Sequence, residues 1–548
     1  MAQFDLHEIA FPALTEAQIA QLGRCTAATL QRYTAGDVLI HVGDRDFKFF
    51  VVRSGEIEIL DLTGDAPATI AVHGRGEFTG DVSHLTGTPA IFTAVALTDC
   101  EVFAISGDVL KQVINQCPEL GDIILRAFMA RRQLVRESGT FTGLRVVGSR
   151  YSPDTFRIRD FLAKNLVLFT WIDIEANPDV DQLLKHFGLT EADTPIVVCK
   201  EHMLRNPSNR DLADAVGILK PLNRTVYDLA VVGAGPAGLA AAVYGASEGL
   251  NTVVLERTAP GGQAGSSMRI ENYLGFPTGL TGSELAERAV LQANKFGAVL
   301  SIPAPVTGVT FNDSYSVIAL EGGETVVTKC LLVATGADYR RLEVEGCAQF
   351  EGSGVFYAAT PNEVQQCRGA TVAVVGGGNS AGQAAVFLAG QASQVFILIR
   401  GKDLYKQMSA YLARRIEQTP NIEVLLETSV ERMLGNGQLS TIEVVSRKSG
   451  ERRTLRVAAL FSFIGAIPRT DWLPPDIETD ARGFVCTGPA VERLSPGVTR
   501  REPFLLETSR RGVFAAGDVR ASSVKRVASA VGEGSMAIQF VHEYLKEM

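Results

Sequence analysis

The sequence lacks any two cysteines spaced as a redox dithiol or a zinc site requires. Its eight cysteines are at least 17 positions apart, and they are Cys25, Cys100, Cys117, Cys199, Cys330, Cys347, Cys367 and Cys486. A CxxC dithiol and the usual zinc spacings are therefore absent. We expect most of these thiols to be buried small side chains in a reducing compartment, and we predict no metal site.

The chain also lacks long apolar runs and an excess of positive charge. No run approaches the roughly 18 residues that span a bilayer. The first residues carry acids but no basic region of the kind that begins a secretory signal. The net charge is −9, so no overall field attracts nucleic acid or an anionic membrane. We therefore expect a cytoplasmic protein with no nucleic-acid partner and no membrane span.

Three styles of sequence follow one another along the chain. With 548 residues, the chain is too long for one core, and its length suggests about three or four domains. Up to about residue 105, short β-rich runs alternate with Gly and Asp turns, which predicts a small antiparallel roll or barrel. Residues 107–139 show the apolar spacing of helices. Residues 141–220 alternate strands and helices, with helices expected near 153–165 and 179–188, which indicates a compact α/β domain.

The last and largest part opens with a strand, a glycine-rich turn, a helix and a second strand. An apolar run from Tyr227 leads into Gly233, Gly235 and Gly238. In such a unit the first glycine permits the tight turn and the second lets a pyrophosphate approach the backbone. The third lets the helix pack close to the strand. Glu256 ends the second strand, 23 residues after Gly233, where an acid can bind ribose hydroxyls. The unit predicts a dinucleotide site.

A second unit of the same kind begins about 140 residues later. Its turn carries Gly376, Gly378 and Ala381, and Arg400 and Lys402 stand at the end of its second strand in place of an acid. Cations there accommodate a ribose 2′-phosphate, so the pattern favours NADPH over NADH. An acid follows closely, and a solvated cluster of charges at a strand end is the alternative interpretation.

Two further segments belong to the first site. The run CLLVATG ends a strand at Thr335 and Gly336, and GVFAAGDV ends another at Gly517 and Asp518. An acid at position 518 is suited to bind the ribityl or pyrophosphate part of a flavin nucleotide. The predicted flavin site therefore uses both ends of this region, and the second unit is inserted between them.

These motifs, with GGQ ending at Gln263 and ENYLGFP around Asn272, resemble the low-molecular-weight thioredoxin reductase family over about 320 residues. The resemblance implies an FAD-binding domain at 226–338 and 468–548 and an NADPH-binding domain at 339–467. It also implies that Gln263 and Asn272 lie near the flavin and that the two domains rotate against each other. We further expect a homodimer.

The departure from that family lies at its dithiol. The family carries CxxC just before the second glycine motif, whereas this sequence has Ala358 and Pro361 at the two cysteine positions. Neither side chain can form a thiolate or accept reducing equivalents. The usual dithiol relay is therefore excluded at this site, and we interpret the nearby Cys367 as structural.

Residues 141–220 resemble a glutaredoxin or thioredoxin-like domain. Thr194-Pro195 stands where such domains carry a cis-proline, but the position of their CPxC motif reads Ser152-Pro153-Asp154-Thr155. The hydroxyls of Ser152 and Thr155 have no accessible redox couple. We therefore predict a docking or scaffold role for this domain rather than dithiol exchange.

Residues 1–140 resemble a cyclic-nucleotide-binding domain. The supporting runs are AGDVLIHVGD, VVRSGEIEIL and GEFTGDVSHLTGTPAIFTAVAL, the last of which resembles the phosphate-binding cassette. Asp81 stands where the family has an acid that meets ribose, and Ala90 stands where it has an arginine that meets the cyclic phosphate. Losing that charge-assisted contact costs about 1.5–3 kcal/mol. We therefore predict the fold and only weak binding of a nucleotide-like effector.

The sequence thus predicts a multidomain chain with an N-terminal β-roll and its helices, a thioredoxin-like α/β domain without cysteines, and two Rossmann-like domains. We expect an NADPH-dependent FAD oxidoreductase in which the flavin carries the redox chemistry and no side chain is catalytic. The acceptor must reach the flavin itself, and the candidates are ferredoxin or flavodoxin, a quinone, oxygen or a small disulfide. Because thioredoxin-reductase-like proteins that lack the cysteines include ferredoxin–NADP reductases, the resemblance makes ferredoxin the leading candidate. Two alternatives stay open, namely a regulatory flavoprotein read by a partner and a thioredoxin reductase using a non-local thiol pair.

Overall fold

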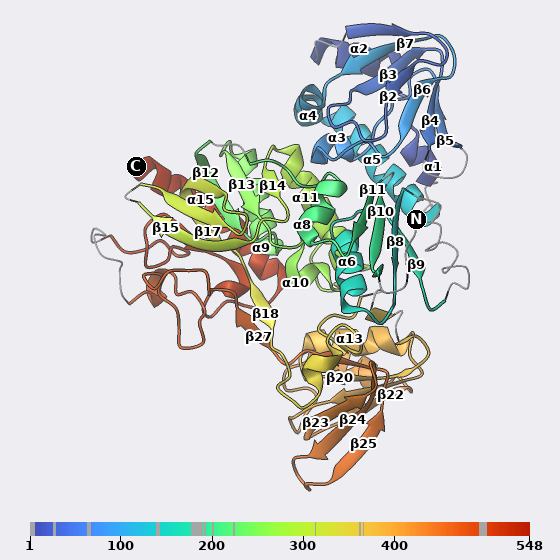
Figure 1. The fold of residues 1–548 in the computed structure, drawn as a ribbon. Coiled ribbons are helices and arrows are strands. Elements are labelled where there is room, and N and C mark those ends of the chain that lie inside the picture. Colours follow the sequence, from blue (N-terminus) through green and yellow to red (C-terminus); the bar gives the residue numbers. More distant parts are fainter. Residues whose placement is uncertain are drawn as a thin grey trace.

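The computed structural model is built from several sheets that lie side by side. The described residues are 6–25, 29–62, 67–138, 143–176, 190, 193–199, 202–222, 225–312, 314–360, 363–364, 367–492 and 501–548. Pro361 and the helix expected near 179–188 lie outside them. Figure 1 shows the blue N-terminal sheets and the orange part of the C-terminal half at opposite ends of the molecule, with a smaller sheet between them. None of the described helices is long and apolar enough to cross a membrane.

The N-terminal part consists of two antiparallel sheets backed by helices. The strands lie in the orders β1-β7-β3 and β2-β6-β4-β5. They are β1 (Thr29–Tyr33), β2 (Val38–Ile40), β3 (Phe49–Ser54), β4 (Ile57–Asp61), β5 (Ala68–His73), β6 (Thr93–Ala96) and β7 (Cys100–Ile105). The helices are α1 (Leu6–Ala10), α2 (Glu16–Cys25), α3 (Ser83–Thr86), α4 (Gly107–Gln116) and α5 (Pro118–Ser138). The apolar spacing read in the sequence buries Phe49, Phe78 and Phe128 between sheet and helices.

The middle part is a four-stranded sheet in the order β11-β10-β8-β9. The β8–β9 pair is parallel, and the other two pairs are antiparallel. The elements are β8 (Leu144–Gly148), α6 (Pro153–Lys164), β9 (Thr170–Asp173), β10 (Ile196–Cys199), β11 (His202–Arg205) and α8 (Asn209–Ala215). The Thr194-Pro195 peptide bond before β10 is cis.

The largest sheet has seven strands and carries the first glycine turn at the end of β12. Six strands lie in the order β14-β13-β12-β17-β16-β15, and β28 pairs with β17. The strands are β12 (Tyr227–Val232), β13 (Thr252–Leu255), β14 (Val299–Ser301), β15 (Val306–Phe311), β16 (Ser316–Leu320), β17 (Thr325–Val333) and β28 (Val513–Ala515). The helices are α9 (Pro236–Ser247), α10 (Gly262–Gly265), α11 (Gly282–Lys295), α15 (Val527–Glu547) and the short η3 (Gly488–Ala490) and η4 (Gly517–Val519). Its central strands are apolar on both faces, because helices α9, α11 and α15 pack on one face and residues of β15, β16 and the 472–485 segment pack on the other.

The inserted part contains a parallel five-stranded sheet and a three-stranded antiparallel sheet. Their strand orders are β19-β26-β20-β21-β22 and β23-β24-β25. The strands are β19 (Val355–Phe356), β20 (Thr371–Val375), β21 (Gln394–Leu398), β22 (Ile422–Leu425), β23 (Thr428–Gly435), β24 (Leu439–Ser446), β25 (Arg452–Arg456) and β26 (Ala459–Ser462). The helices are η2 (Cys347–Phe350), α13 (Asn379–Ala389) and α14 (Ala410–Glu417).

A two-stranded ribbon joins the inserted part to the large sheet. Strand β18 (Ala337–Tyr339) pairs antiparallel with β27 (Ala466–Pro468). The domain boundaries predicted at 338/339 and 467/468 fall within this ribbon. Because both chain crossings pass through this short pair of strands, the two nucleotide-binding parts are connected by little backbone.

Candidate active site

The first glycine turn follows β12 and has no room for larger side chains. Gly233 has φ +106°, and a Cβ there would lie 2.4 Å from the carbonyl O of Ala334. A Cβ at Gly238 would lie 1.9 Å from the carbonyl O of Gly233. Gly235 caps the first turn of α9. The turn therefore brings helix amides and backbone to one edge of the sheet, where a phosphate can approach them.

A cavity of about 1010 Å³ opens at this edge of the sheet. It is lined from four segments of the first site, and these include Gly233, Gly235, Glu256, Gln263, Thr335, Gly336, Gly517 and Asp518. Ala358 and Ser380 reach it from the inserted part, and Pro153 and Phe156 from helix α6. Gly238 packs beneath the turn and does not line the cavity. The structure thus brings the predicted residues from both ends of the region to one cavity.

Glu256 holds the glycine turn in place. Its Oε2 accepts a hydrogen bond from the amide of Ala234 at 2.7 Å, and its Oε1 accepts one from the amide of Thr258 at 2.9 Å. A carboxylate has lone pairs for about four hydrogen bonds, so capacity for ribose hydroxyls remains. Thr335 Oγ1 donates to the carbonyl O of Arg469 at 2.7 Å and ties the second segment to the end of the ribbon.

Asp518 is a partly buried acid that lines the cavity. Burial raises the pKa of its carboxyl, Lys525 opposes the rise, and Glu533 adds to it. Within the described residues nothing donates a hydrogen bond to its carboxylate, because Lys525 Nζ instead donates to the Asp518 backbone carbonyl at 2.6 Å. A partly buried acceptor of this kind fits a ligand hydroxyl.

Trp472 provides the complementary case of a buried donor. Its Nε1 lines the same cavity and has no acceptor among the described residues. Buried polar atoms in folded proteins nearly always have a hydrogen-bond partner. An unpaired donor, an unpaired acceptor and a glycine-walled cradle together fit a ligand with hydroxyls, ring acceptors and a pyrophosphate, as a flavin dinucleotide has.

The two other residues predicted near the flavin are placed differently. Gln263, on α10, lies in the cavity wall and donates from Nε2 to the carbonyl O of Ala337. Asn272 is exposed, in the loop closed by the Ile270–Leu280 bridge, and does not line the cavity. Its location near a flavin stays a prediction that this arrangement does not support.

The second glycine turn follows β20 and repeats the local geometry of the first. Gly376 has φ +147°, and a Cβ there would lie 2.5 Å from the carbonyl O of Phe463. Gly378 caps α13 in an extended conformation and has open space where a side chain would be. Ala381 is fully buried and takes the place of the third glycine. The turn therefore leaves the start of α13 accessible to a second dinucleotide.

The cations beside the second turn are available for an anion. Arg400 and Lys402 follow β21 and are exposed. Neither forms an ion pair with a carboxylate of the described residues. The acid that follows them, Asp403, accepts a hydrogen bond from the amide of Tyr405 at 2.8 Å. Asp403 therefore stabilises its own turn, and it lies beyond ion-pair distance of both cations.

The cysteine-free segment lies at the cavity. Ala358 lines it. Cys367 is buried, its Sγ donates to carbonyl oxygens of the preceding turn at 3.6 Å, and burial raises its pKa to about 12. All the cysteines whose side chains the structure describes are free thiols. No thiol pair among them replaces the missing dithiol.

Helix α6 of the middle part begins at the rim of the same cavity. The Oγ of Ser152 accepts the amide of Thr155 at 3.3 Å, and Pro153 occupies the first helical turn. Serine at the N-cap and proline in the first turn are both favoured at a helix start. The segment at the CPxC position therefore caps helix α6. Pro153 lies 3.6 Å from a Cβ placed on Gly352, and the rings of Phe156 and Phe356 are 6.0 Å apart. The helix start therefore packs on the segment that precedes Ala358.

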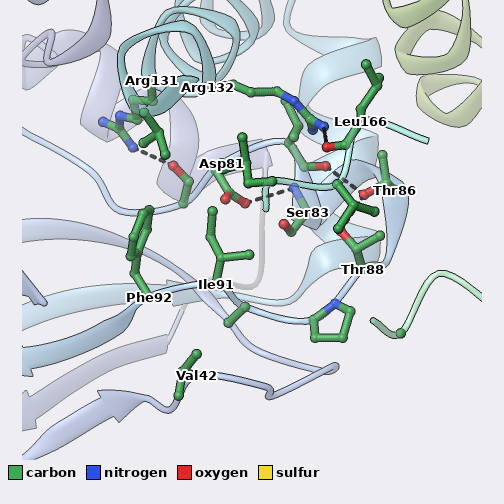
Figure 2. A pocket seen from close by; sticks show the side chains of 18 of the residues that line it. Val42, Asp81, Ser83, Thr86, Thr88, Ile91, Phe92, Arg131, Arg132 and Leu166 are labelled. Atoms are coloured by element: carbon green, nitrogen blue, oxygen red, sulfur yellow. Dashed lines mark hydrogen bonds between the residues drawn. The ribbon is translucent and has the colours of Figure 1, made fainter. Parts of the chain in front are cut away.

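A second cavity, of about 790 Å³, lies where the N-terminal part meets the other parts. Figure 2 shows Asp81, Ser83, Thr86 and Thr88 around it, with Ile91 and Phe92 on the apolar side. The Asp81 carboxylate accepts the amide of Ser83 at 2.8 Å. Ala90 contributes no charge to the wall.

Two arginines of α5 border this cavity and are satisfied by protein groups. Arg131 donates to the carbonyl oxygens of Ala10, Phe78 and Gly80 at 2.6–2.9 Å. Arg132 donates to the carbonyl O of Leu166 at 2.6 Å and pairs with Glu287 at 3.0 Å. Figure 2 marks the hydrogen bond from Arg132 to the backbone carbonyl of Leu166 as a dashed line. Arg131 therefore links helix α5 to other segments of the N-terminal part, and Arg132 links it to the middle part and to α11.

Some residues of the two cavities carry no local sequence signal. Leu166, Pro260 and Glu287 line both cavities and form a common wall. Trp472 and Lys525 were missed because each stands in an unremarkable loop and becomes a site residue only through the tertiary fold. The sequence predicted that a helix begins near Pro153, but it did not predict that the start of this helix, α6, lies at the larger cavity.

The chain matches known families in two places. Residues 227–534, more than half of the chain, match the family described as pyridine nucleotide-disulphide oxidoreductase. Residues 30–117 match the cyclic nucleotide-binding domain.

Curated relatives and solved structures agree with the larger match. The chain is similar to thioredoxin reductase from Treponema pallidum (strain Nichols), 35% identical over 322 residues, which are 59% of this chain and 98% of the relative. Thioredoxin reductase from Bacillus subtilis (strain 168) is 31% identical over 324 residues, 59% of this chain and 96% of the relative. The Lactococcus lactis thioredoxin reductase structure (FR conformation) superposes with a TM-score of 0.53 at 28% identity, covering 59% of this chain and 100% of that chain. The T. acidophilum enzyme gives 0.52 at 28%, covering 58% and 98%.

The family match supplies the cofactors of the two glycine turns. Thioredoxin reductases use FAD and NADPH, and both turns of this chain retain the backbone geometry that dinucleotides need. The N-terminal match identifies the β-rich part with its two sheets as a cyclic nucleotide-binding domain. The chain belongs to the pyridine nucleotide-disulphide oxidoreductase family and is a thioredoxin-reductase-like, NADPH-dependent FAD oxidoreductase.

Proposed function

We propose that the chain passes electrons from NADPH through FAD to a small acceptor that enters the flavin cavity directly. The observation that carries the proposal is the cysteine-free wall of that cavity. Ala358 lines it on one side, and helix α6 covers the segment before Ala358 from the other. A protein acceptor needs a contact area of about 800 Å² on its own surface. The packed side chains of Pro153 and Phe156 occupy the surface by which a protein would approach the cavity. This favours a quinone or similar small oxidant over ferredoxin, flavodoxin or thioredoxin.

The residues of the first site would hold FAD, which supplies the two-electron redox chemistry when bound. The backbone at Gly233, Gly235 and Gly238 would receive the pyrophosphate, with Glu256 and Asp518 accepting hydroxyls. Trp472 Nε1 would donate to an acceptor of the ligand. The remaining wall of this site would consist of Gln263, Thr335, Gly336 and Gly517. Tyr339 is partly buried in the cavity wall, and burial raises its pKa, so it would stay a neutral phenol at this site.

The second site would hold NADPH. The start of α13, with Gly378 as its cap and Ala381 packed beneath Gly376, would receive the pyrophosphate. Arg400 and Lys402 would pair with the 2′-phosphate, because they are exposed and have no carboxylate partner in the described part of the chain.

The middle part is proposed to be a thioredoxin-like docking domain. The support is its strand order, β11-β10-β8-β9 with one parallel pair, together with the cis bond before β10. The segment from Ser152 to Thr155, which stands at the CPxC position, caps α6 and packs against the inserted part. The free, widely spaced thiols suit a reducing cytoplasm, and a homodimer remains a proposal that sedimentation would test.

Steady-state NADPH oxidation tests the proposed acceptor class. Menadione, ferredoxin, flavodoxin and thioredoxin are compared with the full chain and with Phe156→Ala, which weakens the α6 contact. Phe169→Ala, in the core of the same middle domain, is the matched control. We expect menadione to be the best acceptor of the wild type, and only Phe156→Ala to improve turnover with protein acceptors. Preferred reduction of any of the three proteins by the wild type would contradict the proposal.

A second candidate function is regulation, in which a partner reads the state of the flavoprotein. The observation that favours it is the common wall of Leu166, Pro260 and Glu287 between the two cavities. Sustained NADPH oxidation with an artificial acceptor supports the enzyme. Flavin reduction by NADPH without turnover on any acceptor would support the regulator.

A further inference from the structure

Lys220 is a partly buried cation with no carboxylate partner among the described residues. It follows α8 in the connection to the flavin domain and lines the smaller cavity. Its Nζ lies 3.5 Å from Asn294 Oδ1, and no carboxylate of the described residues lies within 4.0 Å of it. Burial and the nearby Lys111 lower its pKa to about 8. Removing a charge from water without a partner is unfavourable, so the site is incomplete as it stands.

The other buried cations of this cavity differ from Lys220. Arg131 is bonded to three carbonyl oxygens, and Arg132 has both a carbonyl and the Glu287 carboxylate. Their positive charges are therefore used inside the protein. Lys220, by contrast, combines partial burial, a place in the cavity wall and a neutral partner at the limit of hydrogen-bond distance.

A second unpaired cation stands at the same end of the cavity. Arg45 lies between β2 and β3, lines the cavity, and forms no ion pair with the described residues. Its guanidinium lies 3.4 Å from a Cβ placed on Gly217, and that same Cβ would collide with Pro89 at 2.3 Å. The Lys220 Cε lies 3.9 Å from a Cβ placed on Gly87. Both cations therefore border the loop from Gly87 to Ala90.

The rest of the wall shows what kind of anion fits. The hydroxyls of Thr86 and Thr88 lie 2.9 Å apart beside the same loop. Further in, the wall is apolar, with Ile40, Ile91 and Phe92. The volume of about 790 Å³ lies within the range of roughly 300–1,000 Å³ typical of small-molecule sites. Cations and hydroxyls at one end, with apolar side chains beyond them, match a phosphate attached to a base-sized ring system.

Four carboxylates also line this cavity, and none of them neutralises Lys220. Glu287 is paired with Arg132, and Asp81 accepts the amide of Ser83. Asp61 and Asp214 line other parts of the wall, and neither lies within ion-pair distance of Lys220. A phosphate that enters the cavity can therefore pair with the Lys220 ammonium, which forms no ion pair with the described residues.

We propose that this cavity binds a small nucleotide through Lys220 and Arg45, two cations that lie outside the loop where cyclic nucleotide-binding domains carry theirs. Lys220 belongs to the connection into the flavin domain, and Asn294 belongs to α11 of that domain. A bound phosphate therefore contacts both the N-terminal domain and the reductase. The proposal is independent of the acceptor that the flavin uses.

Calorimetry with three probes tests the proposal. Full-length protein loaded with FAD is saturated with NADP⁺, so that the probes cannot occupy the second dinucleotide site. Adenosine, AMP and cyclic AMP are titrated into the wild type, Lys220→Met and Lys111→Met. Lys111 neighbours Lys220 but does not line the cavity, which makes it the matched control.

We expect AMP or cyclic AMP to bind the wild type more tightly than adenosine does, and their ranking shows whether an open or a cyclic phosphate fits better. Lys220→Met should weaken the phosphate probes by roughly tenfold or more, the scale of a charge-assisted hydrogen bond, and leave adenosine unchanged. Lys111→Met should preserve or strengthen phosphate binding. Equal affinity for adenosine and the phosphates, no binding of either phosphate at millimolar concentration, or no effect of Lys220→Met would each overturn the proposal.

A labelling experiment on the wild type covers the case in which Lys220→Met does not fold. Lysines are acetylated with acetic anhydride, with or without each probe, and the modified positions are read by mass spectrometry. AMP or cyclic AMP should protect Lys220 and leave Lys111 reactive, whereas adenosine should protect neither. Protection of Lys220 by adenosine to the same degree, or by no probe at all, would refute a phosphate contact.

Discussion

Arg132 of helix α5 and Glu287 of helix α11 form an ion pair of 3.0 Å that joins the N-terminal domain to the flavin domain. The same guanidinium donates to the carbonyl O of Leu166, a residue at φ +61°. Residues other than glycine rarely adopt that conformation. Since Leu166 and Glu287 line both cavities, Arg132 holds the wall between the effector side and the flavin side.

The first prediction concerns this contact. Arg132→Gln should lower the free energy of unfolding by about 1.5–3 kcal/mol, because a largely buried carboxylate and a carbonyl lose a charged donor. Hydrogen exchange should increase in residues 164–168. Arg136→Gln is the matched control, because Arg136 is 45% exposed and lies 3.6 Å from Glu287, so its loss should cost less than about 1 kcal/mol. Equal effects of the two variants would show that Arg132 has no special role in the wall.

The second prediction concerns flavin retention. Asp518→Ala should lose FAD on gel filtration, because the partly buried carboxylate is available to a ligand hydroxyl and its removal weakens binding by about 1.5–3 kcal/mol. Asp471→Ala is the control, since Asp471 lines the same cavity but is exposed. The flavin absorbance of the protein peak measures the outcome. Full retention of FAD by Asp518→Ala would remove Asp518 from the site.

Local patterns and tertiary contacts explain what sequence could and could not predict. The glycine turns at Gly233 and Gly376 were predictable because strand, turn and helix are contiguous and their geometry is set by residues a few positions apart. The docking of Phe156 on Phe356 was not, because it joins segments about 200 positions apart and each ring alone looks like ordinary core. Lys220 was missed for the same reason, since its burial depends on Asn294 and on the N-terminal domain.

The third prediction concerns the nicotinamide cofactor. NADPH should reduce the flavin faster than NADH does in stopped-flow measurements. Arg400→Glu should narrow or reverse the preference, because losing the cation at the 2′-phosphate costs about 1.5–3 kcal/mol. Lys448→Glu changes an exposed charge on the β24–β25 turn and should leave the preference unchanged. Equal reduction rates for the two nucleotides in the wild type would rule out the role given to Arg400 and Lys402.

The fourth prediction follows from the lowered pKa of Lys220. Its ordinary value of 10.5 falls to about 8 in the folded protein. The unfolded chain therefore binds more protons between these values, and stability rises with pH across this window. Below pH 8 the buried charge destabilises the ligand-free protein by up to about 3 kcal/mol. Lys220→Met should raise the free energy of unfolding at pH 7, and its advantage should fade above pH 10.

Chemical denaturation at several pH values measures this effect. Lys111→Met is again the control, because it removes a neighbouring like charge but leaves the buried ammonium. It should stabilise the protein less than Lys220→Met does. A Lys220→Met variant that is less stable than the wild type at pH 7 would mean that the ammonium has a partner outside the described residues.

The last prediction concerns the route by which electrons leave. The chain should show little NADPH-dependent reduction of thioredoxin and should reduce ferricyanide or a quinone readily, because Ala358 and Pro361 replace the dithiol. Restoring the pair as Ala358→Cys with Pro361→Cys should not create a thioredoxin reductase. A relay needs a partner that can resolve the mixed disulfide, and the approach is covered by helix α6, whose start carries Ser152 and Thr155 instead of cysteines.

The single variants Cys199→Ser, Cys347→Ser and Cys367→Ser complete this assay. Burial raises the pKa of Cys347 and brings that of Cys367 to about 12, so neither thiol forms the reactive thiolate near neutral pH. Cys199 lies at the other cavity, on β10. None of the three substitutions should alter turnover with ferricyanide. Robust thioredoxin reduction by the wild type, abolished by any one of them, would show that a non-local thiol pair carries electrons out of the flavin and that the small-acceptor proposal is wrong.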